Sequence, residues 1–168
     1  MEILICFILI FILVPFLSLA PWYPTRDGDL LRIKEAVDLQ PKDRFLEIWC
    51  GTAKVSLFLA KNFPNNQVTG IEFSIIMYLY SRIKVHLSKQ QNIRIIYGNA
   101  LMVDFSKYDV VYVYGMPETL TKKLFPRLKE RVGEKFRLIS YCFPMKNDFF
   151  EEKIYSEKNR NSIYEYKL

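Results

Sequence analysis

Residues 44–53 read Arg44-Phe45-Leu46-Glu47-Ile48-Trp49-Cys50-Gly51-Thr52-Ala53. The run at 44–49, in which four of the six residues are apolar, is typical of a strand, and the small residues that follow it predict a tight turn. Apolar residues then recur at helical spacing from Val55 to Lys61, which predicts a helix. A strand, a turn and a helix in this order predict one β-α unit.

The same alternation continues on both sides of this unit. Upstream, apolar spacing predicts a helix over residues 30–39, with Asp27 or Asp29 as its N-cap. Downstream, the predicted strands cover residues 67–72, 93–97, 109–114 and 135–142, and the predicted helices cover 75–88 and 118–132. Residues 151–158 and 162–168 alternate around Asn159-Arg160-Asn161 and predict a terminal β-hairpin. We therefore expect an α/β fold with five parallel strands, a C-terminal hairpin and helices on both faces of the sheet.

The composition is that of one folded domain. The chain has 168 residues, of which 51% are apolar and 15% aromatic, so it can bury its own core and is neither collagen-like nor low in complexity. The three cysteines, Cys6, Cys50 and Cys142, are odd in number and show no C-x-x-C spacing. This pattern predicts neither a disulfide framework nor a zinc site, and it favours a reducing compartment.

The first 20 residues differ from the rest. Residues 3–20 contain no charge and are long enough to cross most of a bilayer, so they predict a transmembrane anchor. A cleaved signal peptide is the alternative, because Ser18-Leu19-Ala20 loosely resembles a cleavage site. No Lys or Arg precedes the run, the run is longer than a usual signal, and Pro21 would follow the cut, which favours the anchor.

Charge predicts the topology and the kind of surface that the domain meets. Arg26, Arg32 and Lys34 follow the span whereas only Glu2 precedes it, so we expect a single-pass protein with its C-terminal domain on the cytoplasmic side. The 148 residues after the span carry 24 basic and 17 acidic side chains, a net charge of +7. This balance favours contact with anionic surfaces, whether phospholipid or nucleic acid. The expected organisation is an anchor at 1–20, a linker at 21–29 and a domain at 30–168.

Three segments are expected to meet at a ligand site. In an open α/β sheet, ligands bind beyond the carboxyl ends of the strands, where the strand order reverses. The turn at 47–53, Glu72 and the run Gly98-Asn99-Ala100 all follow predicted strands. Glu72 ends its strand about 20 residues after Gly51, the position where a carboxylate accepts hydrogen bonds from two ribose hydroxyls.

Four further runs complete a family pattern: Gly70-Ile71-Glu72-Phe73, Tyr80-Ser81-Arg82, Gly115-Met116-Pro117 and Ser140-Tyr141-Cys142-Phe143-Pro144. With the turn, they resemble the class I S-adenosylmethionine-dependent methyltransferases. More narrowly, they resemble the membrane-anchored lysine methyltransferases that modify the ATP-synthase c subunit and the adenine nucleotide translocase, together with their prokaryotic relatives. The resemblance implies a Rossmann-like domain, S-adenosyl-L-methionine as cofactor, and a lysine of a membrane-associated protein as acceptor, with no nucleic-acid partner.

The resemblance also implies roles for particular residues. The cofactor would be held by Glu47, Trp49, Gly51, Ala53, Glu72, Phe73, Asn99 and Ala100. The reaction would be an in-line attack by an amine on a sulfonium methyl, which needs no metal. A lysine has an ordinary pKa of about 10.4 and must lose its proton first, and Glu118 and Tyr141 are the candidates that would assist.

Departures from the family pattern keep other interpretations open. Trp49 stands where the family has its first glycine, and Ala53-Lys54 and Phe73-Ser74-Ile75 also differ from the usual residues. A module that no longer binds the cofactor would explain Trp49, and a lipid or small-molecule methyltransferase would explain the anchor equally well. The organism could also read a UGA codon as glycine at position 49. Translation of the gene with a table that reads UGA as tryptophan would then place Trp49 in this sequence. Glu47, Glu118 and the only histidine, His86, each have an ordinary structural explanation as well.

Overall fold

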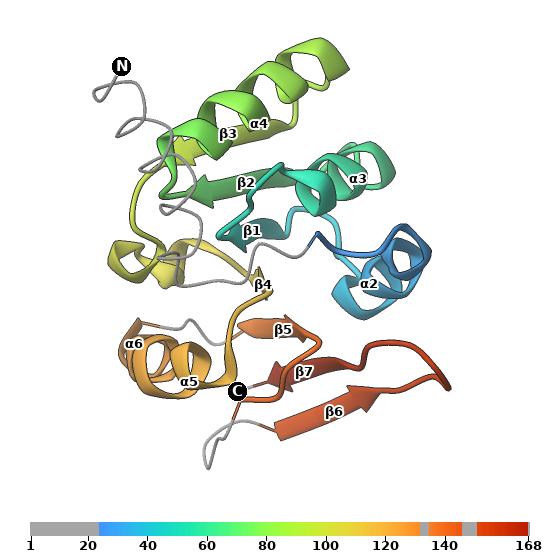
Figure 1. The fold of residues 1–168 in the computed structure, drawn as a ribbon, viewed down its shortest axis with the longest axis vertical. Helices are drawn as coiled ribbons and strands as arrows, with labels where there is room; N and C mark the ends of the chain where they lie inside the picture. Colours follow the sequence, from blue (N-terminus) through green and yellow to red (C-terminus); the bar gives the residue numbers. More distant parts are fainter. Residues whose placement is uncertain (1–23, 132–134, 146–150, 168) are drawn as a thin grey trace, which may run out of the picture.

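A computed structural model of the chain describes residues 24–131, 135–145 and 151–167. These residues form one seven-stranded sheet with the order β3-β2-β1-β4-β5-β7-β6 (Figure 1). The strands are β1 Arg44–Ile48, β2 Gln67–Glu72, β3 Ile93–Tyr97, β4 Val110–Val113, β5 Arg137–Tyr141, β6 Glu151–Tyr155 and β7 Ile163–Lys167. The main helices are α2 Leu30–Val37, α3 Lys54–Asn62, α4 Ile75–Ser88, α5 Pro117–Thr119 and α6 Phe125–Arg131.

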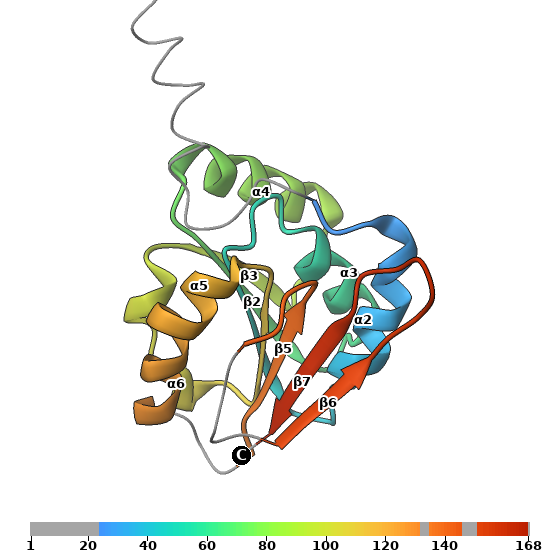
Figure 2. The same cartoon turned by 60° about the horizontal axis from the view of Figure 1, so that its bottom comes forward.

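The pairing of the strands confirms the predicted topology. Strands β1 to β5 pair in parallel with one another, whereas β7 is antiparallel to both β5 and β6. The hairpin thus extends the sheet at the edge opposite β3 (Figure 2). The strand order reverses between β1 and β4, so the carboxyl ends of these two strands form the switch point at which α/β sheets bind ligands.

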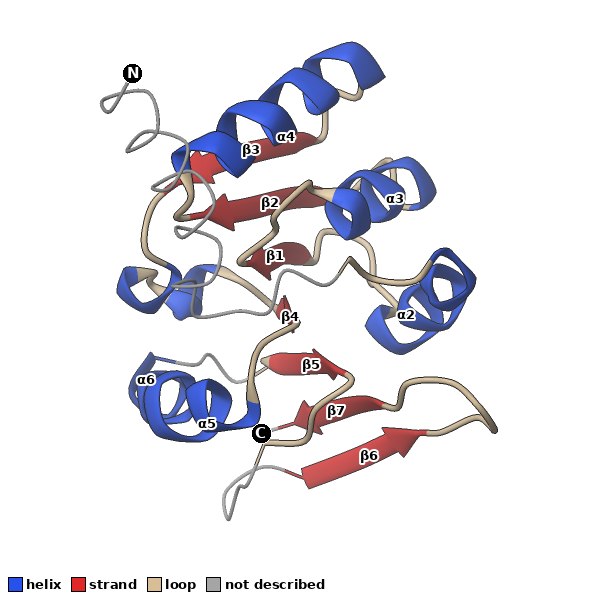
Figure 3. Ribbon diagram, in the orientation of Figure 1, coloured by secondary structure: helices blue, strands red, loops and turns tan. Residues whose placement is uncertain are grey.

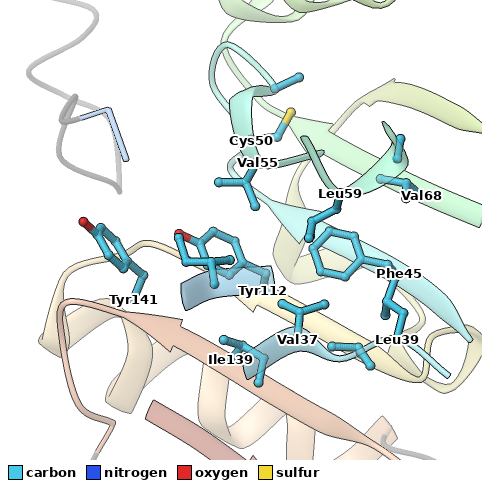
Figure 4. Packing of buried hydrophobic residues seen from close by; sticks show 14 of the residues in the cluster. Val37, Leu39, Phe45, Cys50, Val55, Leu59, Val68, Tyr112, Ile139 and Tyr141 are labelled. Carbon is cyan, nitrogen blue, oxygen red and sulfur yellow. The ribbon is translucent and has the colours of Figure 1, made fainter. Parts of the chain in front are cut away.

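Apolar residues on both faces of each central strand explain the layers of helices. Phe45 and Val110 pack in one core cluster with residues of α2 and α3, while Leu46 and Val111 pack in a second cluster with residues of the α5–α6 segment. Side chains alternate along a strand, so a strand buried on both faces must be apolar at nearly every position. Figure 3 shows helices on both faces, and Figure 4 shows the first cluster, in which Leu59 of α3 lies beside Phe45.

One local prediction holds only in part, and another is wrong. Asp29 is the N-cap residue of α2, as predicted, but its side chain makes no capping bond, because residues 27–29 form a 3₁₀ helix and the buried Asp29 carboxylate bonds Arg32 and Tyr141 instead. The helix predicted over 118–132 is interrupted by a π turn at Leu120–Leu124. Pro126 follows this turn and lacks the N–H that a regular helix would donate to the carbonyl four residues earlier, which accounts for the local change of hydrogen bonding.

The end of the predicted linker packs on the domain. The Lys54 ammonium donates to the carbonyl oxygen of Thr25 at 2.5 Å and forms an ion pair with Asp27 at 2.9 Å. Thr25 is itself buried, with its hydroxyl 3.4 Å from that of Tyr112. The ordered domain therefore includes Thr25. Across the described ranges no helix is long and apolar enough to span a membrane, and the anchor predicted at 3–20 lies outside them.

Candidate functional site

The carboxyl ends of β1, β2 and β3 are joined by backbone hydrogen bonds. The Cys50 N–H donates to the Ile71 carbonyl at 3.0 Å, and the Gly98 N–H donates to the Glu72 carbonyl at 2.9 Å. The turn after β1, the acid that ends β2 and the loop after β3 are thus neighbours, as the sequence predicts. This edge adjoins the switch point, so the predicted segments meet where the topology places a ligand site.

The Glu72 carboxylate organises this edge. One oxygen accepts the Gly51 N–H and the other accepts the Ser74 N–H, both at 2.8 Å. The side chain is buried. A carboxylate oxygen can accept two hydrogen bonds, so each oxygen retains capacity for a ligand hydroxyl.

Glu47 lies deeper than Glu72 and caps the helix that follows the turn. Its Oε2 accepts the Ser56 N–H at 2.8 Å and the Ser56 hydroxyl at 2.5 Å, which satisfies a free donor in the first turn of α3. Its Oε1 accepts no hydrogen bond from any residue within 24–131, 135–145 or 151–167. Burial raises the pKa of Glu47 to about 7, although the bonds from Ser56 oppose the shift.

In the turn after β1, every second residue has a left-handed backbone conformation. Trp49, Gly51 and Ala53 all have a positive φ, at 56°, 51° and 54°. This left-handed region costs a residue with a Cβ roughly 1 kcal/mol or more, and glycine adopts it freely. The backbone therefore explains why a family would have glycine at each of the three positions, two of which this chain fills with other residues.

The indole of Trp49 lies across the switch point. A Cβ added to Gly115, two residues beyond β4, would be only 2.7 Å from Cζ3 of this indole. The ring also packs on the cluster that contains Ile48 and Leu120. The indole therefore occupies the space between the carboxyl ends of β1 and β4.

The other predicted cofactor residues surround this edge in different ways. Ala53 and Ala100 are buried, whereas Phe73 and Asn99 are exposed. The Asn99 side chain accepts the Leu101 N–H at 3.0 Å, so it caps the short helix that follows. Its side-chain N–H groups donate to no other described residue.

The two predicted catalytic residues occupy contrasting positions. Glu118 is exposed and pairs with Lys122 at 2.6 Å, and this contact lowers the pKa of its carboxyl. Tyr141 is buried, donates its hydroxyl proton to Asp29 at 2.8 Å and accepts a bond from Asn161 at 2.9 Å. Burial, and then the bond to Asp29, raise the pKa of Tyr141 to about 12. This geometry disfavours Tyr141 as a proton acceptor and leaves Glu118 accessible.

Sequence reasoning missed several residues that build the site. Ser56 and Ser74 supply the partners of the two acids, and the Lys84 ammonium donates to the Thr52 carbonyl at 3.2 Å. Ser56 belongs to no capping box, in which an N-cap Ser or Thr is followed three residues later by Glu or Gln, so no local pattern indicates it. Nothing local indicates Lys84, because α4 places it against the turn only in the folded chain.

Residues 47–149 match the family described as the ANTKMT methyltransferase domain. The match covers more than half of the chain. The chain belongs to this family. Membership confirms the predicted methyltransferase class, and with it the class of cofactor, S-adenosyl-L-methionine.

Curated relatives of this ANTKMT-family chain are more distant. A probable ribosomal RNA small subunit methyltransferase A of Methanosarcina acetivorans is 29% identical over 70% of this chain and 38% of the relative. A demethylmenaquinone methyltransferase of Bacillus cytotoxicus is 31% identical over 46% of this chain and 33% of the relative. The chain thus spans well under half the length of these relatives.

Solved structures confirm the fold. An RNA methyltransferase from Salinibacter ruber, in complex with S-adenosyl-L-homocysteine, superposes with a TM-score of 0.77 at 19% identity and covers 85% of this chain and 92% of its own. A methyltransferase from Geobacter sulfurreducens, in complex with the same molecule, has a TM-score of 0.60 at 16% identity and covers 79% of this chain and 51% of its own. The domain of this ANTKMT-family chain is therefore the Rossmann-like methyltransferase fold expected from the sequence.

The two ends of the site differ in how well they suit this cofactor. At Glu72, the buried carboxylate with remaining acceptor capacity fits a ribose, and the open Oε1 of Glu47 fits an ammonium group. At Trp49, the indole narrows the space beside Gly115. No cluster of three or more His, Cys, Asp or Glu suited to a metal ion occurs among the described residues.

Proposed function

We propose that this chain transfers a methyl group from S-adenosyl-L-methionine to a lysine side chain of a membrane-associated protein. Residues 3–20 would hold the domain at the cytoplasmic face of a membrane. The observation that carries the proposal is the geometry of Glu72 at the end of β2. Its carboxylate accepts the Gly51 N–H at 2.8 Å and can accept further hydrogen bonds from a ligand. The family match supports the same reaction class.

Three acidic residues have separate roles in the proposed reaction. When bound, the cofactor supplies a methyl group activated by a positively charged sulfur, so the protein chiefly has to bind, align and exclude water. Glu72 would accept hydrogen bonds from the ribose hydroxyls, and Glu47 would offer a buried carboxylate to the ammonium group. Glu118, on the exposed rim after β4, would attract the lysine ammonium group, whose proton would leave to the solvent.

The acceptor is the less constrained part of the proposal. Lysine and a membrane-associated target are favoured by the family resemblance and by the uncharged run at 3–20, since an anchored domain meets targets near the bilayer at high effective concentration. The names of the curated relatives point to other acceptors, an RNA and a quinone precursor. These relatives are much longer, and the parts of them that this chain does not match offer one place for that specificity.

One observation favours a second candidate function. The Trp49 indole fills space beside Gly115 at the switch point, which supports a domain that keeps the fold but has lost the cofactor. Such a chain would act as a membrane-anchored binding module. The two candidates differ in one measurable property, the affinity for S-adenosylmethionine.

Calorimetric titration of the full chain with S-adenosylmethionine, and with NAD as the comparison ligand, tests the proposal. We expect saturable binding of S-adenosylmethionine and none of NAD. Absence of both favours the binding module. Mass spectrometry of membrane proteins from a deletion strain should then show the loss of a lysine methylation. A change confined to soluble proteins or to RNA would contradict the proposed acceptor.

A further inference from the structure

Helix α4 presents an apolar face to the outside of the molecule. Its exposed large apolar side chains have relative accessibilities of 37 to 70%. They are Ile75, Ile76, Leu79, Tyr80, Ile83 and Leu87. A regular helix turns by 100° per residue, so these six side chains lie within an arc of about 140°, which also contains the exposed His86. We call this set the α4 face.

The inner side of α4 does not account for the apolar character of the helix. Only Ser81 is fully buried, with Tyr78 and Val85 packing partly against the core. The apolar face of a helix is normally packed against another part of the protein or a partner. Figures 1 and 2 show α4 at one extremity of the molecule, over the edge strand β3, where no other described element covers it. The α4 face therefore has the character of an interaction surface.

The charges around the α4 face have one sign. Residues 73–103, which contain the helix and β3, include no Asp or Glu and carry Arg82, Lys84, Lys89 and Arg94. Lys84 is committed to the Thr52 carbonyl, but Arg82 and Lys89 are exposed. These two side chains line a surface hollow together with His86 and Leu87 at the C-terminal part of the helix. Apolar side chains beside cations complement a surface that offers acyl chains beneath anionic headgroups.

The start of the domain restricts how far it can lie from a membrane. Thr25 is tied to the domain through Lys54, and it lies only five residues after Ala20, the end of the uncharged run. Five residues reach at most about 18 Å. If residues 3–20 cross a bilayer, the domain lies close to its surface. Helix α4 begins at Ile75, directly after Ser74. The Ser74 N–H donates a hydrogen bond to the Glu72 carboxylate.

We propose that the α4 face lies on an anionic lipid bilayer, with its apolar side chains at the boundary of the headgroups and acyl chains. The inference deepens the proposed function, on which it rests for the anchor at 3–20. It supplies a second contact that orients the domain and holds the Glu72 edge near the membrane surface. The site would then meet lysines that lie just outside the bilayer and would not meet those far from it.

Depth-dependent quenching in vesicles tests this placement. The full chain is labelled with an environment-sensitive fluorophore at Ile83→Cys, in a background with Cys6→Ala and Cys142→Ala, and is reconstituted into vesicles with nitroxide-bearing lipids. The matched control is Ile154→Cys on β6, which is similarly exposed but lies at the opposite edge of the sheet. We expect the nitroxide lipids to reduce emission at position 83 about twofold or more and to leave position 154 unchanged.

Charge supplies a second arm of the experiment. Quenching at position 83 should be stronger in vesicles that contain anionic lipid than in neutral ones, and Arg82→Gln combined with Lys89→Gln should remove this difference. Lys61→Gln combined with Lys158→Gln, two exposed cations elsewhere on the domain, should leave it unchanged.

Other occupants of the α4 face give different results. Equal and weak quenching at positions 83 and 154 overturns the proposal. Shielding of position 83 that needs an added membrane protein assigns the face to a protein helix, and shielding that rises with the density of the chain itself assigns it to a second copy. Each of these outcomes also overturns it. Titration with S-adenosylmethionine is independent of this face, so binding without quenching leaves the proposed function intact while the membrane contact fails.

Discussion

Trp49 is the bulkiest departure from the family pattern at the candidate site. It combines a left-handed backbone conformation, with φ at 56°, and an indole packed against Gly115. Glycine would avoid both features, since it adopts the left-handed region freely and has no side chain. Glycine is also scarce in this chain, at 6 of 168 residues. Recoding of UGA could account for at most two missing glycines, because the chain has two Trp residues.

Trp49→Gly should strengthen S-adenosylmethionine binding by about tenfold or more, because it removes both the bulk and a strained backbone position. Calorimetry on the full chain measures the change. Ala53→Gly is the matched control, because it relaxes a neighbouring left-handed position without clearing space. A UGA at codon 49 in an organism that reads it as glycine supports the recoding explanation, and a UGG codon excludes it. Equal or weaker binding by Trp49→Gly argues for a true binding module.

Glu72→Ala should weaken S-adenosylmethionine binding by roughly 1.5 to 3 kcal/mol, the range for hydrogen bonds to a charged group. The same change frees the Gly51 and Ser74 N–H groups, so the turn also loses its main tie. Glu35→Ala removes an exposed acid of α2 and serves as the control. An affinity that does not change in Glu72→Ala would refute the assignment of this acid to the ribose.

Glu47 should make stability depend on pH. Its pKa is about 7 in the folded chain against 4.5 as the reference value, so the neutral form is favoured on folding. The stabilisation that comes from this raised pKa is fully present below about pH 4.5 and is lost as the pH rises through about 7. The loss lowers the free energy of unfolding by roughly 3 kcal/mol. Urea unfolding of the wild type and of Glu47→Gln over this range measures it. The difference in the free energy of unfolding between the two proteins should change steadily with pH. A difference that stays constant over this range would contradict the raised pKa of Glu47.

At the scale of elements, Asp29 ties the two ends of the domain together. Its buried carboxylate forms an ion pair with Arg32 at 3.0 Å and accepts a hydrogen bond from the Tyr141 hydroxyl at 2.8 Å. Arg32 in turn donates to the carbonyls of Tyr155 and Asn161, before and within the loop of the β6–β7 hairpin. The helix that starts the domain, the last parallel strand and the hairpin are thus held by one polar network.

Asp29→Ala should destabilise the domain by about 3 kcal/mol, because it leaves a buried cation and a buried hydroxyl without their shared acceptor. The value lies at the low end for a broken buried pair since Arg32 keeps its bond to Glu157. Thermal unfolding measures the loss. Asp27→Ala, which removes the exposed partner of Lys54, should cost far less. Equal losses in the two variants would show that the Asp29 network adds nothing beyond a surface pair.

Tyr141→Phe separates the structural role of this tyrosine from a catalytic one. The network predicts a loss of about 1 to 2 kcal/mol in stability, with kcat retained, because the hydroxyl serves Asp29. Kinetics of methyl transfer over a range of pH, alongside thermal unfolding, supply both readouts. A large fall in kcat with a changed pH profile and unchanged stability would instead establish Tyr141 as a catalytic residue.

At the scale of the whole molecule, the chain combines a basic domain with an uncharged N-terminal run. A reporter fused after Leu168 should be active in the cytoplasm, since Arg26, Arg32 and Lys34 flank only the C-terminal end of the span. Fusions to a periplasmic or luminal reporter supply the control. A mature N-terminus at Pro21 would show that residues 3–20 are a cleaved signal, and the topology prediction would fail.

The order and type of the elements follow from the sequence because they depend on local periodicity. The strands at 67–72 and 93–97 and the helix at 75–88 have the predicted bounds, and the hairpin pairs as expected. The convergence of Gly51 and Glu72 also follows, since parallel strands place their carboxyl ends at one edge. The missing side-chain cap at Asp29 and the π turn at 120–124 arise where a distant partner or a proline overrides local preference.

By itself, the sequence determined the fold class, the family and the acid at the end of β2, because each is written in spacings of a few residues. Only the tertiary structure decided which groups those spacings bring into contact. It placed the Trp49 indole against Gly115, buried Glu47 until its pKa reaches about 7, and left the α4 face uncovered. These features depend on contacts between residues far apart in the chain, where packing and desolvation act and local pattern carries no information.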